Sequence, residues 1–62
     1  MPIIHVNLIE GRTIEQKRKL VSAMTEAVVK SLDVKPDAVR IILHDLAKHN
    51  LATAGVLRSD QK

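Results

Sequence analysis

The stretch TIEQKRKLVSAMTEAVVKSL, residues 13–32, decides the fold. Apolar side chains recur in it at three- and four-residue steps: Ile14, Leu20, Val21, Met24, Ala27, Val28 and Leu32. This pattern predicts an amphipathic helix over residues 14–32, about 28 Å long. Thr13 followed by Gln16 has the form of a capping box, in which two side chains satisfy free backbone donors at a helix start. We expect Pro36 and Asp37 to end the helix, because the residue before a proline disfavours helical geometry.

Two segments of alternating pattern flank this helix. Residues 3–9, IIHVNLI, are rich in β-branched residues and are followed by Glu10-Gly11-Arg12, a tight exit loop, so they predict a strand. Residues 39–46, VRIILHDL, predict a second strand. On the first strand, Ile4, Val6 and Leu8 are expected on one face and Ile3, His5, Asn7 and Ile9 on the other. On the second strand, Val39, Ile41 and Leu43 are expected to face opposite to Arg40, Ile42 and His44.

A strand, a helix of matching length and a second strand predict a right-handed crossover with parallel strands. The expected fold class is therefore α/β (α+β), a β-α-β unit of two parallel strands crossed by one long helix. Residues 48–62 are expected to add a loop or short hairpin, with the last few residues frayed. Residues 1–62 are expected to form a single domain.

The composition points to an oligomer. A chain of 62 residues hides only about 60% of its unfolded surface when it folds alone. It contains no cysteine, so disulfides and thiolate metal sites are excluded, and its three histidines show no metal-ligand spacing. With 45% hydrophobic residues, the chain carries more apolar surface than one helix and two strands can bury. We therefore expect association with other copies, and neither a metal nor a cofactor.

Other classes of protein find little support. The first residues lack a basic region before an apolar run, so we expect no signal peptide, and no stretch approaches the roughly 20 apolar residues of a membrane helix. The absence of cysteine fits a reducing compartment, and a cytoplasmic location is expected. The net charge of +3 is dispersed along the chain, so no nucleic-acid partner is expected.

Several short motifs together resemble the 4-oxalocrotonate tautomerase family. They are Met1-Pro2, residues 8–12 (LIEGR), residues 15–17 (EQK), Val39-Arg40 and Ala54-Gly55. The resemblance runs from Pro2 to about Asp60. It implies a β-α-β monomer that assembles as a hexamer, a trimer of dimers, with sites shared between subunits. It also implies cofactor-free enol–keto isomerisation of small unsaturated 2-oxo carboxylates, of the kind met in aromatic degradation.

By the same resemblance, Pro2 would be the general base once Met1 is removed. An α-amine has a pKa near about 7.7–8, and an apolar, cationic environment lowers it further. A neutral secondary amine of this kind is well matched to proton transfer near neutral pH. While Met1 is attached, the nitrogen of Pro2 is an amide and cannot act as a base. Without the family, a proline at this position commonly has no function.

The resemblance assigns the remaining site to four residues. Arg40 would bind the 2-oxo-carboxylate end and stabilise enolate charge, although such an arginine can also be solvated or paired at an interface. Arg12, in the strand-to-helix loop, would bind a distal carboxylate, although a loop arginine is usually just solvated. The backbone amide of Ile9 would add a hydrogen-bond donor. Leu51 stands where the family usually has an aromatic residue, so the apolar wall changes shape.

Alternative functions remain open at this point. The same fold could support hydration or decarboxylation, for which the only acids near the expected site are Glu10 and Asp45. A small basic oligomer that binds nucleic acid or another anion would use Lys17, Arg18 and Lys19, but it lacks aromatic residues for base stacking. His5 and His44 are expected to be partly buried or interfacial rather than catalytic.

Overall fold

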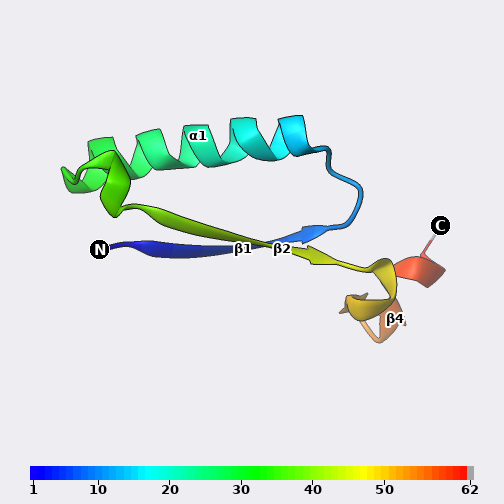
Figure 1. Ribbon diagram of the computed structural model, residues 1–62. Coiled ribbons are helices and arrows are strands. Elements are labelled where there is room, and N and C mark those ends of the chain that lie inside the picture. The colour runs from blue at the N-terminus through cyan, green and yellow to red at the C-terminus, as the bar shows by residue number, and fades with distance from the viewer. Residues whose placement is uncertain (62) are drawn as a thin grey trace.

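The computed structural model describes residues 1–61, so Lys62, the end of the expected tail, lies outside the described residues. Strand β1 (Ile3–Ile9) pairs in parallel with β2 (Arg40–Leu46), in a register that runs from Ile3 opposite Arg40 to Ile9 opposite Leu46. Helix α1 (Ile14–Leu32) connects the strands and lies along one face of the sheet (Figure 1). The β-α-β prediction is confirmed.

Helix α1 begins where the sequence predicts and ends for a different reason. The capping box is present: the backbone N–H of Gln16 donates to the Thr13 hydroxyl (3.0 Å), and that of Thr13 donates to the Gln16 side chain (2.9 Å). At the other end, Asp33 adopts a left-handed conformation (φ 54°), and its N–H still bonds the Val29 carbonyl. The helix has therefore ended before Pro36, and the prediction that Pro36 and Asp37 terminate it was wrong.

Pro36 instead opens a short 3₁₀ turn, η1 (Pro36–Ala38). The N–H of Val39 bonds back to the Pro36 carbonyl at 3.1 Å. Because that hydrogen bond closes the turn, the second strand begins at Arg40 and not at Val39 as predicted. Within residues 1–61, no helix is long and apolar enough to cross a membrane.

The two faces of the sheet divide as the alternation predicts. The helix-facing side carries half-buried residues, namely Ile4, Val6, Leu8, Ile41 and Leu43. The opposite side, which we call the open face, carries Ile3, His5, Asn7 and Ile9 on β1 and Arg40, Ile42, His44 and Leu46 on β2. Helix α1 covers only the first side, so the hydrophobic core of this chain is a thin layer, and no residue among 1–61 is fully buried.

The isolated chain is flat and extended. Its radius of gyration is 14.7 Å and its extents are 42 × 24 × 14 Å. A compact domain of 62 residues would have a radius of gyration of about 10.6 Å. The accessible surface is 4997 Å², against about 4,000 Å² for a compact monomer of 6.9 kDa. The surplus includes exposed apolar residues on the open face and beyond the sheet, such as Ile3 (54%), Ile42 (41%) and Val56 (45%).

The residues after β2 form a small hairpin that projects beyond the end of the sheet (Figure 1). A 3₁₀ turn, η2 (Lys48–Asn50), leads into β3 (Ala52–Thr53), which pairs antiparallel with β4 (Val56–Leu57). The hairpin alternative is thus confirmed. The expected fraying was wrong for η3 (Arg58–Asp60), because the N–H of Gln61 closes that turn on the Arg58 carbonyl and the N–H of Arg58 bonds the Leu51 carbonyl at 2.7 Å.

The turn of this hairpin predicts a stabilising substitution. Ala54 and Gly55 both have positive φ, 54° and 79°, and only glycine adopts such values without a steric cost. Ala54→Gly is therefore expected to raise the free energy of unfolding by about 0.5–1 kcal/mol per chain. Thermal unfolding at fixed protein concentration measures the change. Ala52→Gly, in β3, is the matched control and should destabilise the chain; equal effects at the two positions would contradict the explanation.

Candidate functional site

Pro2 and Arg40 lie together at the amino ends of the two strands. The N–H of Arg40 donates to the Pro2 carbonyl at 3.1 Å, and Arg40 stands opposite Ile3 in the ladder. Pro2 is half-buried, whereas the Arg40 side chain is exposed on the open face. Within residues 1–61 the ion pairs join Lys17 to Asp45, Arg18 to Glu15 and Lys30 to Glu26, so Arg40 has no carboxylate partner in its own chain. Its guanidinium is available to an external anion.

Met1 stands directly before Pro2, and its side chain is 74% exposed. With Met1 in place, the nitrogen of Pro2 belongs to a peptide bond and has no basicity. Met1 is not held by packing, so its removal would not disturb the sheet. A free Pro2 amine would then sit at the end of β1, next to the start of β2 at Arg40.

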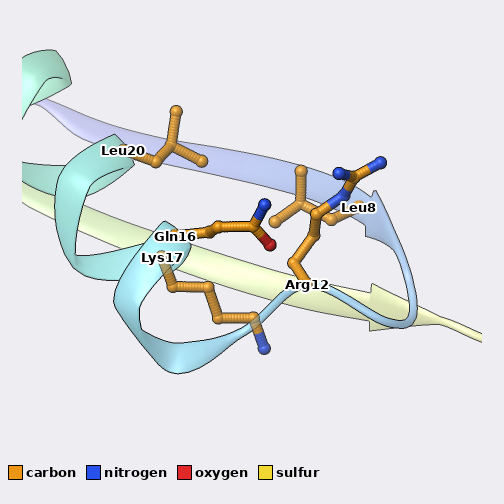
Figure 2. Close-up of a pocket in the computed structure, with 5 residues that line it drawn as sticks. All are labelled: Leu8, Arg12, Gln16, Lys17 and Leu20. Carbon is orange, nitrogen blue, oxygen red and sulfur yellow. The ribbon is translucent and has the colours of Figure 1, made fainter.

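Arg12 lies at the opposite, carboxyl end of the sheet. The N–H of Glu10 extends the ladder by bonding the Leu46 carbonyl at 2.8 Å, and Gly11, with φ 112°, then turns the chain toward α1. A pocket of about 220 Å³ opens beneath this loop, and Figure 2 shows the side chains that line it, which are Leu8, Arg12, Gln16, Lys17 and Leu20. Two leucines give it an apolar lining. Arg12 adds a cation that takes part in no ion pair within residues 1–61, whereas the Lys17 ammonium is paired with Asp45.

An ion pair joins the helix to the sheet at the same, carboxyl end. The Lys17 ammonium lies 2.6 Å from an Asp45 carboxylate oxygen, which ties α1 to β2. The side chains are 27% and 48% exposed, so the pair is partly shielded from water. The sequence pattern placed Lys17 on the solvent side of the helix. The three-residue step to Leu20, which faces the sheet, is the signal that would have placed it at the pocket.

Ile9 and Leu51 also belong to the carboxyl end. Ile9 is the last residue of β1 and is half-buried, and Leu51 follows η2, is 38% exposed and accepts a hydrogen bond from Arg58. The structure therefore groups Ile9, Arg12 and Leu51, and separates them from Pro2 and Arg40 by the length of β1, about 20 Å. One chain does not bring the five predicted residues into one site.

Within residues 1–61, no group of three or more His, Cys, Asp or Glu side chains is arranged to hold a metal ion. The groups that can act chemically are an amine released at Pro2, the guanidinium of Arg40, and the Arg12 cation at the far pocket. This inventory supports proton transfer on an anionic substrate, provided that two chains supply the two ends.

Comparison with known proteins identifies related chains along nearly the whole length. A family model described as "Tautomerase enzyme" matches residues 2–61. A probable tautomerase of Halalkalibacterium halodurans is 41% identical over 61 residues, covering 98% of this chain and 100% of the relative. A structure from work on the 4-oxalocrotonate tautomerase isozymes of Methylibium petroleiphilum is 53% identical with a TM-score of 0.91, covering 94% of this chain and 91% of that one. A chain of a heterohexamer 4-oxalocrotonate tautomerase from Chloroflexus aurantiacus is 26% identical, with full coverage of both chains and a TM-score of 0.93.

Proposed function

The chain belongs to the tautomerase family, and on that premise we propose that it is a cofactor-independent enol–keto tautomerase of small unsaturated 2-hydroxy or 2-oxo carboxylic acids, acting in the cytoplasm. The observation that carries this proposal is the position of Pro2 beside Arg40 at the amino ends of two parallel strands. That arrangement puts a latent amine base and an arginine that forms no ion pair within residues 1–61 at the same edge of the sheet. It needs no metal and no bound cofactor.

The proposed chemistry is a proton transfer in which the amine of Pro2 is both base and acid. The neutral amine takes the hydroxyl proton of the 2-hydroxy dienoate, and the oxygen electron pair forms the 2-oxo group as the double bonds shift. The protonated amine then returns the proton to a carbon of the chain. No atom is gained or lost, so the reaction is an isomerisation. A base with a pKa near the working pH serves both steps.

Arg40 would hold the carboxylate beside the reacting oxygen. A guanidinium can donate two parallel hydrogen bonds to a carboxylate, which fixes the orientation of the substrate. The same cation stabilises negative charge that develops on the 2-oxygen in the transition state. The exposed Arg40 side chain, which has no carboxylate partner within residues 1–61, is free for this role.

We propose that the full site forms between chains of a homo-oligomer, most simply a hexamer built as a trimer of dimers. Pro2 and Arg12 lie at opposite ends of β1, so a neighbouring chain in antiparallel orientation would bring its Arg12, Ile9 and Leu51 toward Pro2. The flat shape and the apolar side chains left exposed on the open face also favour association. The related heterohexamer of Chloroflexus aurantiacus is a precedent for the assembly.

The rival functions have weaker support. Hydration or decarboxylation would call for an acid at the site, yet Asp45 is paired with Lys17. Binding of nucleic acid would need free cations along α1, yet Lys17 and Arg18 both pair with carboxylates.

The direct test follows ketonisation of a phenylpyruvate-type enol and of a 2-hydroxymuconate by ultraviolet absorbance. Turnover is expected for protein whose intact mass corresponds to loss of Met1. Protein that retains Met1 should be inactive, because its Pro2 nitrogen is an amide. Turnover by the Met1-retaining form, or none by the processed form, would contradict the proposal.

Arg12 gives a prediction about substrate class. Arg12→Ala is expected to raise KM at least about tenfold for the dicarboxylate hydroxymuconate, because the distal carboxylate loses a charge-assisted hydrogen bond worth about 1.5–3 kcal/mol. The monocarboxylate phenylpyruvate enol should be affected much less. Arg18→Ala, which removes a surface cation paired with Glu15, is the control. Steady-state kinetics on both substrates measure the difference, and equal losses on the two would contradict it.

A mixed assembly tests whether Arg12 acts in a neighbour's site. Chains carrying Pro2→Ala and chains carrying Arg12→Ala are unfolded together and reassembled in equal amounts. If the site takes these two residues from different chains, about a quarter of the sites regain both, and activity on the dicarboxylate rises well above either parent. Activity that stays at the mean of the two parents would place both residues of each site in one chain.

A further inference from the structure

Two histidines on the open face remain outside the proposed reaction. His5 on β1 and His44 on β2 have ring centres 6.0 Å apart, with the ring planes at 82°. Both side chains are exposed in the chain. Among residues 1–61, the side-chain hydrogen bonds and ion pairs involve neither imidazole, so their nitrogens are not committed elsewhere.

The register supplies a third donor. Asn7 stands directly opposite His44 and lies on the same face as His5, two positions along β1. Residues two apart on a strand are about 6.6 Å apart and diagonal neighbours across a ladder about 7–8 Å, so these three side chains form a triangle on the sheet surface. We call His5, Asn7 and His44 the open-face triad. It offers two imidazole nitrogens and one amide oxygen.

The surroundings of the open-face triad are apolar apart from one cation. Ile42 stands opposite His5, and Ile9 and Leu46 continue the face toward the carboxyl end. No carboxylate belongs to the open face, and the charged group on it is Arg40, diagonal to His5 across the ladder. A cation bound at the triad would therefore be held by neutral nitrogen ligands. The positive charge of Arg40 would repel it only weakly.

The spacing suits a transition metal. Imidazole nitrogens bind Zn²⁺ at about 2.0–2.1 Å, so two histidines on one tetrahedral ion have their ring centres about 5 Å apart. The observed 6.0 Å is reached from that value by small side-chain rotations, which exposed rings can make. Imidazole ligands select Zn²⁺, Ni²⁺ and Cu²⁺ over Mg²⁺ and Ca²⁺, which prefer oxygen.

We propose that the open-face triad is a binding site for a divalent transition-metal ion, in which His5 and His44 are the ligands and Asn7 supports them. The remaining coordination positions are open to water or to the same face of a second copy. This site is separate from Pro2 and goes beyond the proposed tautomerase function. Sequence spacing did not reveal it, because its two histidines come from different strands.

Isothermal titration of the assembled protein with Zn²⁺ and with Ni²⁺ tests the proposal. Saturable binding of at most one ion per chain is expected, with no binding of Mg²⁺. His5→Gln and His44→Gln should each weaken binding at least about tenfold, as loss of a ligand costs no less than loss of its outer-shell support. His49→Gln, in η2 away from the open face, is the matched control and should bind as before.

A second measurement needs no variant. In the unmodified protein, Zn²⁺ should shift or broaden the ring-proton resonances of two histidines and leave those of the third unchanged. Absence of Zn²⁺ and Ni²⁺ binding would overturn the proposal. So would binding that requires His5 but survives His44→Gln, because the ion would then be held by the N-terminal amine and His5 rather than by the triad.

Discussion

Pro2→Ala is expected to lower kcat/KM for enol ketonisation by at least about 100-fold, within the range of about 10²–10⁴ that a positioned general base contributes. The pyrrolidine ring holds its nitrogen stiffly at the end of β1, beside Arg40. Alanine leaves a primary amine on a freely rotating chain end, so both the basicity and the position of the nitrogen change. Ultraviolet kinetics with the two enol substrates measure the effect.

The chain offers a matched control for this variant. Its other proline, Pro36, opens the turn before β2 and takes no part in the proposed chemistry. Pro36→Ala should keep activity within about twofold of the parent once its folding is verified by circular dichroism, since its effect is limited to backbone entropy. Intact masses must show that every protein compared has lost Met1. Full activity in Pro2→Ala would rule out proline as the base.

Arg40→Ala is expected to reduce kcat by on the order of 100-fold or more, because it removes a charge that faces the developing enolate. KM should rise as well, since the carboxylate loses its paired hydrogen bonds. Arg40→Lys is expected to recover little of this, because an ammonium does not reproduce the planar fork of a guanidinium. Steady-state kinetics separate the two parameters.

Arg58→Ala is the control for Arg40. Arg58 lies in η3, and its guanidinium makes a long contact of 3.4 Å with the Gln61 side chain. Its replacement should leave kcat within about twofold, as surface substitutions usually do. A change confined to KM in Arg40→Ala would contradict the electrostatic role and leave Arg40 as an anchor only.

Local sequence signals were sufficient for most of the fold. The apolar period of residues 14–32, the capping box at Thr13 and the alternation of both strands predicted α1, β1 and β2 with an error of one residue, at Val39. Each of these signals involves residues close together in the sequence, so it can be recognised without knowledge of the structure. The position of the end of α1 was predicted correctly but its cause was not, because Asp33 ends the helix in a left-handed conformation that aspartate tolerates.

Long-range geometry accounts for what the sequence did not predict. The Lys17–Asp45 ion pair and the contact of His5 with His44 each join residues that are far apart in the chain, and their spacing carries no periodic signal. The candidate site is still harder to predict from the sequence, because its residues lie at both ends of the sheet. Their roles came from resemblance to a family, and the fold of one chain explains only why Pro2 and Arg40 are neighbours.

The distance between the two ends of β1 has a consequence for how the substrate preference of such a protein changes in evolution. The amine and the arginine beside it are set by the strand starts, whereas Arg12, Leu51 and the hairpin turn at Ala54 lie a full strand length away. If the site is shared between chains as proposed, mutations in the hairpin would change substrate preference without disturbing the surroundings of Pro2 in the same chain.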